Sequence, residues 1–326
     1  MRVLEDHFGR KFPYLRLSVT DACNFRCQYC LPNGYKKTGD FQFLSTEEIT
    51  RLIAAFAEMG VEKVRLTGGE PTLRRDLTTI AAAISCIPGI RTIGLTTNGY
   101  SLKEKAGAFF ASGINVLNVS VDSLQPHKFH AITGHDKLPH VLAGIEAARQ
   151  AGFRNIKINT VLLKGVNDDD LPEFLAWVKR EELGVRFIEL MQTGDNLEYF
   201  RKHHLSAEVI KAQLLERGFS LSPRRHDSGP ALEFEHPEYT GKIGMIAPYS
   251  RDFCKSCNRL RVTARGDLRL CLFGEGGYNL RPLLAEDDQR EALQEKLLEL
   301  LHFKRESHYL GQGITGITPH LASLGG

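Results

Sequence analysis

The sequence has little net charge and no long apolar run. Its 326 residues include 42 Lys and Arg against 39 Asp and Glu, a formal net charge of +3 at pH 7. This balance gives no broad positive field of the kind that binds nucleic acid. No apolar stretch is long enough to span a bilayer, and residues 1–7 lack the apolar core of a signal peptide. We therefore expect a cytoplasmic protein that acts without a membrane and without nucleic acid.

The cysteines do not form an even, dispersed set. There are seven of them, an odd number, and all but Cys86 fall into two groups. A disulfide framework would need pairs and an oxidising compartment. The grouping instead favours metal ligands in a reducing cytosol, and we assign no role to Cys86 because a lone cysteine usually behaves as a small apolar residue.

The first group is Cys23, Cys27 and Cys30, with the spacing C-x3-C-x2-C. It supplies three thiolates and no fourth, whereas an iron–sulfur cubane is normally held by four cysteines. Three ligands would leave one iron open to another molecule. The alternatives are a zinc knuckle, which needs a fourth ligand nearby, and buried core thiols, which three cysteines within eight residues disfavour.

The first two-thirds of the chain alternate short β-branched runs with amphipathic stretches, a rhythm typical of parallel βα units. Ser45 and Glu48 form a capping box at the start of the first helix. The expected strands are 15–19, 63–67, 92–96, 116–120, 156–161 and 185–189, and the expected helices between and after them are 45–59, 77–85, 103–111, 138–151 and 171–181. Six units predict an α/β fold with an incomplete (β/α)6 TIM-like barrel.

The rhythm ends after Met191. A helix is expected over 206–216, then short strands and turns up to 272, and a charged helix over 288–301. We predict two parts, a partial barrel over 1–191 and a C-terminal α+β extension over 192–326 that covers the open side of the barrel.

The conspicuous motifs follow the predicted strands one after another. In (β/α) barrels the active site lies at the C-terminal ends of the strands. The motifs at these ends are the cysteine loop, Thr67–Pro71 (Thr-Gly-Gly-Glu-Pro), Thr96–Gly99, Ser120–Ser123, Lys157 within the fifth strand and Met191 after the sixth. Each alone is also explained by a turn, a strand end or core packing, but their shared edge predicts one site.

The second cysteine group is Cys254, Cys257 and Cys271, again three ligands without an evident fourth. His226 or His236 could complete a zinc site, which stays an alternative. Between these cysteines, Arg259 and Arg261 would share one face of a strand.

Basic residues recur on the predicted barrel strands. Buried cations are costly unless they meet an anion, so their placement predicts a phosphorylated substrate. They are Arg16, Lys63, Arg65, Lys157 and Arg186.

The combination of these motifs resembles the MoaA family, the radical S-adenosylmethionine (SAM) GTP 3′,8-cyclases of molybdenum-cofactor biosynthesis. The resemblance rests on C-x3-C-x2-C, Gly-Gly-Glu-Pro, C-x2-C-x13-C enclosing Asn-Arg-Leu-Arg, and the terminal Gly325-Gly326. It implies conversion of GTP to (8S)-3′,8-cyclo-7,8-dihydroguanosine 5′-triphosphate through a 5′-deoxyadenosyl radical. It also implies two [4Fe–4S] clusters, one on each cysteine group.

The resemblance further assigns roles to residues that match the family motifs. Matching positions for SAM are Tyr29, Gly68, Gly69, Glu70, Ser120 and Met191. Matching positions for GTP are Arg16, Arg65, Thr96, Lys157, Arg259, Leu260 and Arg261, with Arg186 a further basic candidate. Gly325 and Gly326 are expected to enter the active site and to be needed for activity.

The partners implied by the resemblance are GTP as substrate, an electron donor of flavodoxin or ferredoxin type, and a cyclic pyranopterin monophosphate synthase that takes the product. The protein is expected to be a monomer or a homodimer. Two other hypotheses remain: a radical SAM maturase acting on a peptide or protein, which would typically carry more C-terminal cysteines, and a non-catalytic zinc module that binds an acidic partner.

Overall fold

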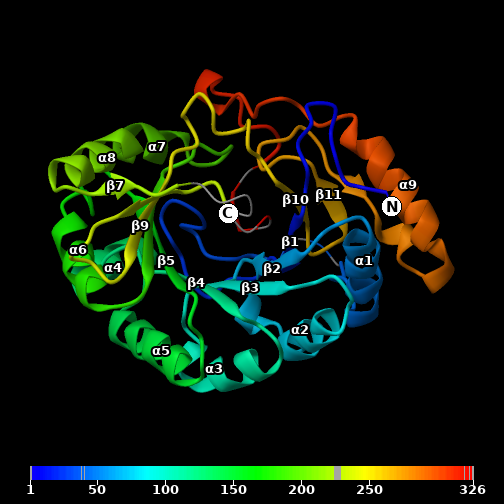
Figure 1. The fold of residues 1–326 in the computed structure, drawn as a ribbon, viewed down its shortest axis with the longest axis horizontal. Coiled ribbons are helices and arrows are strands. Elements are labelled where there is room, and N and C mark those ends of the chain that lie inside the picture. Colours follow the sequence, from blue (N-terminus) through cyan, green and yellow to red (C-terminus); the bar gives the residue numbers. More distant parts are fainter. Residues whose placement is uncertain are drawn as a thin grey trace.

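One curved sheet forms the centre of the molecule, with helices outside it (Figure 1). The computed structural model describes residues 2–37, 39, 41–223, 229–318, 320–322 and 324, and all statements below concern these. Six strands of the N-terminal part run parallel, each beside the next in chain order. They are β1 (Tyr14–Thr20), β2 (Lys63–Gly68), β3 (Thr92–Thr97), β4 (Val116–Ser120), β5 (Ile156–Leu162) and β6 (Gly184–Glu189).

Helices connect these strands and cover the outer face of the sheet (Figure 1). The Ser45–Glu48 capping box is present at the first of them, where both reciprocal hydrogen bonds form, so the predicted start is confirmed. The connecting helices are α1 (Thr46–Glu58), the short 3-10 helix η1 (Pro71–Leu73), α2 (Leu77–Ser85), α3 (Leu102–Ala111), α4 (Pro126–Thr133), α5 (Leu138–Gln150) and α6 (Leu171–Arg180).

The C-terminal part extends the same sheet at both edges. Strand β10 (Arg259–Val262) pairs in parallel with β1, and β9 (Lys242–Ile246) pairs in parallel with β6. Short antiparallel strands continue outward from each, so the barrel stays open between the two ends of the sheet. The remaining elements are α7 (Leu197–His203), α8 (Ala207–Glu216), β7 (Ser220–Leu221), β8 (Leu232–Glu235), β11 (Asp267–Arg269), β12 (Tyr278–Asn279), η2 (Arg281–Leu283), η3 (Asp287–Gln289), α9 (Arg290–Leu301) and η4 (Leu310–Gln312).

The predicted fold class is confirmed, with two differences. The parallel part of the sheet is longer than the six predicted strands, because β9 and β10 join it. Helices α4 and α7 were not predicted; α4 is a short segment that begins with Pro126 and ends at Gly134 in the left-handed conformation, a start and stop pattern that the sequence does carry.

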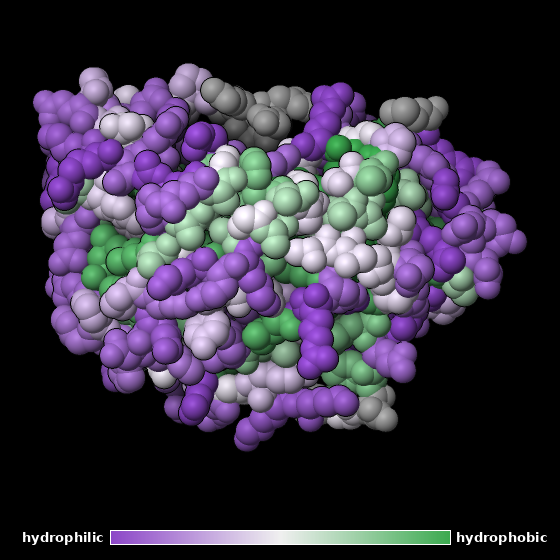
Figure 2. All heavy atoms as spheres, turned by 90° about the horizontal axis from the view of Figure 1, so that it is seen from below, coloured by the Kyte–Doolittle hydropathy of each residue, from purple (hydrophilic) through white to green (hydrophobic). Residues whose placement is uncertain are grey.

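The core lies between the sheet and its helices and is built from the outward-facing apolar side chains of the strands, such as Leu15, Leu17, Val64 and Leu66, all fully buried. The opposite, inner positions of the same strands carry polar and basic residues. Figure 2 shows the outer face on the side of α2, α3 and α5, where hydrophilic side chains surround scattered apolar patches. None of the described helices has the length and apolar composition of a bilayer span.

Candidate active site

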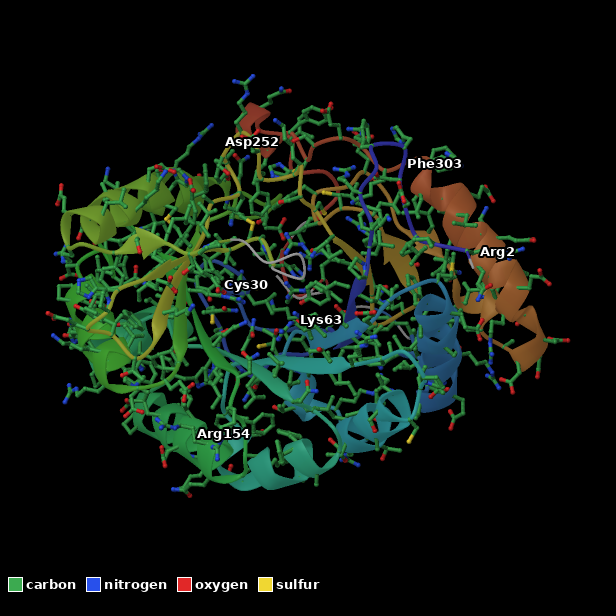
Figure 3. All side chains as sticks on the ribbon, in the orientation of Figure 1. Arg2, Cys30, Lys63, Arg154, Asp252 and Phe303 are labelled. Atoms are coloured by element: carbon green, nitrogen blue, oxygen red, sulfur yellow. The ribbon has the colours of Figure 1, made fainter. Side chains whose placement is uncertain are left out.

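Two neighbouring cavities lie on the inner side of the sheet. The smaller, of about 150 Å³, is lined by all three cysteines of the first group. The larger, of about 460 Å³, is lined by all three cysteines of the second group and by the basic residues of the strands. Asn159, Ile188 and Met191 line both, so the cavities share one wall. In Figure 3, Cys30 and Lys63 lie toward the centre of the ring of elements, whereas Arg2, Arg154 and Phe303 lie at its periphery.

The first cysteine loop is held in place by its backbone and by Phe25. Arg26 N–H donates to the Thr133 carbonyl (3.0 Å) and Gln28 N–H to the Ile132 carbonyl (2.9 Å), which ties the loop to the end of α4. Phe25 is buried and stacks on His135, with ring centroids 4.9 Å apart. The three thiols are therefore presented by a fixed loop.

Burial makes these thiols poor anions by themselves. It raises the pKa of Cys23 to about 11 and that of Cys30 to about 12, and it raises the pKa of Cys27 as well. A thiolate here needs a positive partner, and iron supplies one. No three His, Cys, Asp or Glu side chains of the described residues are gathered for a single metal ion; a cubane does not need this, because each of its irons takes its own cysteine. Three thiols facing one cavity fit such a cluster.

Gly68 and Gly69 pack against the start of the cysteine loop. A Cβ on Gly68 would lie 2.1 Å from the Thr20 carbonyl oxygen, and one on Gly69 would lie 2.3 Å from that of Ala22. Gly68 also has φ of 137°, a conformation that side chains rarely adopt. The double glycine is therefore required for two loops to touch, and both residues line the smaller cavity.

Glu70 turns into the protein. It is 1% exposed, and its carboxylate accepts hydrogen bonds from the Thr72 hydroxyl (2.6 Å), the Thr97 hydroxyl (2.8 Å) and the Asn98 N–H (2.6 Å). These bonds join the end of β2 to the end of β3.

Two described residues predicted for the site, Glu70 and Leu260, line neither cavity.

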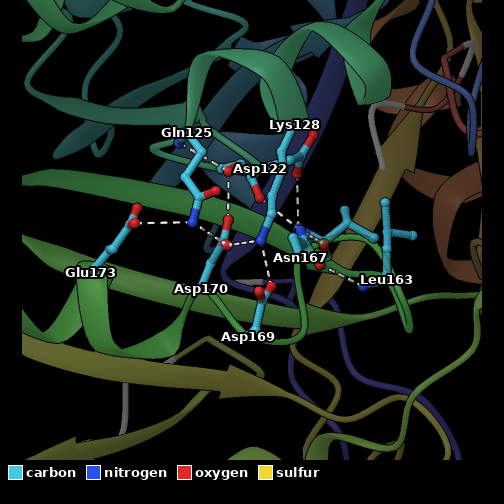
Figure 4. A network of polar contacts seen from close by, with 10 residues as sticks. Asp122, Gln125, Lys128, Leu163, Asn167, Asp169, Asp170 and Glu173 are labelled. Carbon is cyan, nitrogen blue, oxygen red and sulfur yellow. Dashed lines mark hydrogen bonds and ion pairs between the residues drawn. The ribbon is translucent and has the colours of Figure 1, made fainter.

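Asp122 fixes the aromatic residue that precedes the last cysteine. Its carboxylate accepts from the Tyr29 hydroxyl (2.9 Å) and from the Val161 N–H (2.8 Å), and its carbonyl accepts from Asn167 (2.6 Å). Burial raises the pKa of Asp122 to about 6. Figure 4 shows Asp122 and Asn167 beside a further polar network between the start of α4 and the loop before α6. The end of β4 is thereby fastened to the cysteine loop.

The larger cavity has a row of arginines across three adjacent strands. Arg16 on β1 is in register with Arg65 on β2 and with Arg261 on β10. Arg65 and Arg261 are 4% and 7% exposed. Burial lowers the pKa of Arg16 to about 10 and lowers that of Arg261, which reflects the cost of crowding buried cations. An anion in the cavity would relieve that cost.

Lys157 and Arg186 stand on the other side of the cavity. Burial, with the charge of Arg186, lowers the pKa of Lys157 to about 7. Arg186 forms an ion pair with Glu233 at 3.4 Å. Glu233 supplies the one carboxylate among the described residues that line this cavity. Several cations and one carboxylate on the described walls leave this space strongly positive.

Two asparagines complete the wall and were not predicted. Asn118 on β4 is in register with Lys157, and Asn159 on β5 is in register with Arg186. The Oδ1 atoms of both are buried and have no hydrogen-bond partner among the described residues. Buried polar atoms are normally satisfied, so these two point to a ligand. The sequence does carry a signal for Asn159, because the alternation in Ile-Lys-Ile-Asn (156–159) places Lys157 and Asn159 on one face of the strand.

Strand glycines lie opposite two of these cations. Gly244 on β9 is in register with Arg186, and Gly184 on β6 with Lys157. A Cβ on Gly244 would lie 2.8 Å from Arg186 Cγ, whereas one on Gly184 would lie 3.6 Å from Lys157 Cγ. Only the first is too close for a side chain, so Arg186 occupies space that Gly244 leaves.

The second cysteine group lies on the wall of the larger cavity, with Arg259 beside it. Burial raises the pKa of Cys254. Burial would also raise that of Cys257, but the charges of Lys304, Arg259 and Arg10 bring it below the usual value. His236, an alternative ligand, packs against Phe219 and Tyr239, and His226 lies outside the described residues.

The C-terminal segment reaches both cavities as far as it is described. Leu321 and Ala322 line the smaller cavity, and the Leu324 carbonyl accepts a hydrogen bond from Arg261 (3.1 Å). Leu324 also packs in an apolar cluster with Leu272, Phe273 and Leu310. Gly325 and Gly326 lie outside the described residues.

The sequence matches known protein families over most of its length. A profile of the Radical SAM superfamily matches residues 17–178, and a profile described as Molybdenum Cofactor Synthesis C matches residues 183–310. A curated GTP 3′,8-cyclase of Stenotrophomonas maltophilia (strain K279a) is 55% identical over 326 residues and covers 100% of both chains. The chain belongs to the GTP 3′,8-cyclase family. The GTP 3′,8-cyclase of Yersinia pestis is 53% identical over 323 residues, covering 99% of each chain.

Solved structures outside the family share the fold. Streptococcus suis SuiB bound to S-adenosylmethionine aligns with a TM-score of 0.63 at 14% identity, over 90% of this chain and 68% of that one. Native anSMEcpe with AdoMet and a peptide aligns with a TM-score of 0.56 at 13% identity, over 89% and 83% of the two chains. This likeness supports the radical SAM partial barrel and nothing about the substrate.

Proposed function

We propose that this protein cyclises GTP to (8S)-3′,8-cyclo-7,8-dihydroguanosine 5′-triphosphate, the first step of molybdenum-cofactor biosynthesis. The observation that carries this proposal is the pairing of two cavities across one wall, a thiol-lined one and a strongly positive one. Curated relatives of this chain carry the name GTP 3′,8-cyclase, which supports a cyclisation of GTP.

The smaller cavity would hold a [4Fe–4S] cluster on Cys23, Cys27 and Cys30, together with SAM. When bound, this pair supplies the one-electron cleavage that generates a 5′-deoxyadenosyl radical, which removes hydrogen from C3′ of GTP. The protein contributes position. Gly68 and Gly69 bring their backbone close to the cysteine loop, Ser120 and Met191 line the cavity, and Tyr29 lines it with its hydroxyl fixed by Asp122. Glu70 supports the same loop through its backbone N–H, which donates to the Ala22 carbonyl (2.7 Å).

The larger cavity would hold GTP. Its arginine row suits the triphosphate, because guanidinium groups match phosphate oxygens in geometry and charge. Arg16, Arg65, Lys157, Arg186, Arg259 and Arg261 line it, while Thr96 lines the smaller cavity at the end of β3. Leu260, buried behind Arg259 and Arg261, would act by holding the strand that carries them. A second [4Fe–4S] cluster on Cys254, Cys257 and Cys271 would anchor the guanine end.

A highly reactive primary radical demands a fixed substrate and exclusion of water. The continuous curved sheet and the segment around Leu321 and Leu324 would serve both needs, and we propose that Gly325 and Gly326 continue that segment into the site. We further propose the division of the chain into residues 1–191 and 192–326, with the cofactor held mainly by the first and the substrate by both.

The setting of the reaction is also a proposal. The enzyme would work in the cytoplasm as a monomer or homodimer, take electrons from a donor of flavodoxin or ferredoxin type, and pass its product to a cyclic pyranopterin monophosphate synthase. Neither nucleic acid nor a membrane would take part.

The test is an anaerobic reaction of iron–sulfur-reconstituted protein with SAM, a strong reductant and GTP, followed by mass spectrometry. Formation of 5′-deoxyadenosine together with a GTP isomer that converts to a pterin on workup is the expected result. If 5′-deoxyadenosine formed while GTP stayed unchanged, the substrate would be wrong. If protein shown to hold both clusters formed neither, the cyclase proposal would fail and peptide substrates would be tested.

A further inference from the structure

Tyr14 is a phenol among the most crowded cations of the larger cavity. It lies at the start of β1, lines the cavity and is 8% exposed. Its register partners on both neighbouring strands are basic, Lys63 on β2 and Arg259 on β10. The Lys63 Nζ lies over its ring, 5.3 Å from the centroid.

The Tyr14 hydroxyl holds Arg65. The Nε–H of Arg65 donates to it at 2.8 Å, a buried side-chain hydrogen bond. On the other side, Nη1 of Arg65 donates to the Leu95 carbonyl (3.3 Å) and to the Thr96 hydroxyl (3.5 Å). The guanidinium also lies directly over Gly94, where a Cβ would be 2.7 Å from Arg65 Cζ. Contacts from β1 and β3 together fix the plane of this guanidinium.

We propose that Tyr14 is a positioning residue for anion binding, whose hydroxyl holds Arg65 in the orientation in which it meets the triphosphate of the substrate. This proposal rests on the proposed function for the identity of the anion. A side chain that is already oriented loses less conformational entropy when the ligand arrives, so the affinity for a polyphosphate depends on this one oxygen atom.

The hydroxyl of Tyr14 can lose its proton, so its charge, and with it the affinity for an anion, can depend on pH. Burial would raise the pKa of Tyr14, but the charges of Arg65, Arg16, Lys63 and Arg259 lower it to about 7. These four cations lie on β1, β2 and β10, and the charges of Arg261 on β10 and Arg186 on β6 also interact with Tyr14. A polyanion beside them favours the neutral phenol, so above pH 7 binding takes up a proton at Tyr14, and the affinity falls as the pH rises.

The experiment compares Tyr14→Phe with the unchanged protein, both with reconstituted clusters, in equilibrium binding of tripolyphosphate and of GTP. At pH 6.5 we expect the variant to bind about tenfold more weakly, the effect of one hydrogen bond to a charged group. Between pH 6.5 and 9 the advantage of the unchanged protein should shrink by roughly fivefold or more. The protonation of the free ligand is the same in both experiments. The ratio of the two affinities therefore reports the contribution of Tyr14.

A merely structural role would give a ratio that does not change with pH. That result, or equal affinities at pH 6.5, would overturn the proposal. Iron content and SAM binding should be unchanged in the variant, and Tyr239→Phe, beside Phe219 and His236, should bind both ligands normally. Tripolyphosphate carries no guanine, so failure of GTP alone to bind would count against the proposed function and leave the role of Tyr14 intact.

Discussion

The two cavities of the site are built in different ways. The smaller one is shaped by backbone: loops 20–30 and 67–70 touch through Gly69, and hydrogen bonds to Glu70 and Asp122 hold the ends of β2, β3 and β4. The larger one is shaped by long side chains from inner strand positions, which are held by a few side-chain contacts each, such as those of Arg65 with Tyr14 and Thr96. The first should therefore fail as a unit when it is disturbed, whereas the second should lose affinity by degrees.

The largest effect should separate the two cysteine groups. Cys27→Ser should abolish 5′-deoxyadenosine formation, because a serine hydroxyl is a poor ligand for iron at the first cluster. Cys271→Ser should keep SAM cleavage and lose conversion of GTP. Both products are measured by chromatography in one reaction. If Cys271→Ser also ended SAM cleavage, the two cavities would not work independently of each other.

The next effect is on the backbone-built cavity. Gly69→Ala would place a Cβ 2.3 Å from the Ala22 carbonyl oxygen. This backbone atom can move away only if the cysteine loop is distorted. We expect a loss of about 1–3 kcal/mol in the free energy of unfolding and reduced iron loading, measured by denaturant titration and iron analysis. Gly107→Ala in α3, where an added Cβ meets nothing within 4 Å, is the matched control and should be neutral or slightly stabilising. Equal behaviour of the two variants would refute the requirement for glycine at 69.

The side-chain-built cavity should respond in affinity. Gly244→Ala pushes against Arg186 at Cγ, near the root of the side chain, and should weaken GTP binding about tenfold, the worth of one charge-assisted hydrogen bond. Gly184→Ala makes only ordinary contact with Lys157 and should stay within about twofold. Isothermal titration would show the difference, with SAM binding unchanged in both. A weaker effect at 244 than at 184 would contradict this account of Arg186.

The smallest effect is a pH dependence. The pKa of Lys157 is lowered to about 7, so in the free protein its charge fades as the pH rises through 7. A bound anion restores that charge, and GTP affinity should therefore decline between pH 7 and 8.5. Lys157→Arg keeps its charge throughout and should lessen the decline severalfold relative to the unchanged protein at the same pH values. Parallel curves of GTP affinity against pH for the two proteins would exclude Lys157 as a source of the pH dependence.

The sequence allowed prediction where signals are local. The six strands β1–β6 and the motifs at their ends follow from periodicity and turn residues, and the expected basic residues do line the larger cavity. The parallel pairing of β9 with β6 and of β10 with β1 could not be predicted, because short strands far apart in the chain carry no local sign of their neighbours. Asn159 could have been found from the alternation along its own strand, whereas the importance of Tyr14 and Asn118 depends on cross-strand register.

The wall shared by the two cavities limits how this enzyme could be altered. Asn159, Ile188 and Met191 line both spaces, so a substitution that enlarges one of them to admit a bulkier nucleotide also changes the room beside the first cysteine loop. Redesign of substrate choice should therefore begin at residues that only the larger cavity contacts, such as Val116 or Leu270, and leave the common wall as it is.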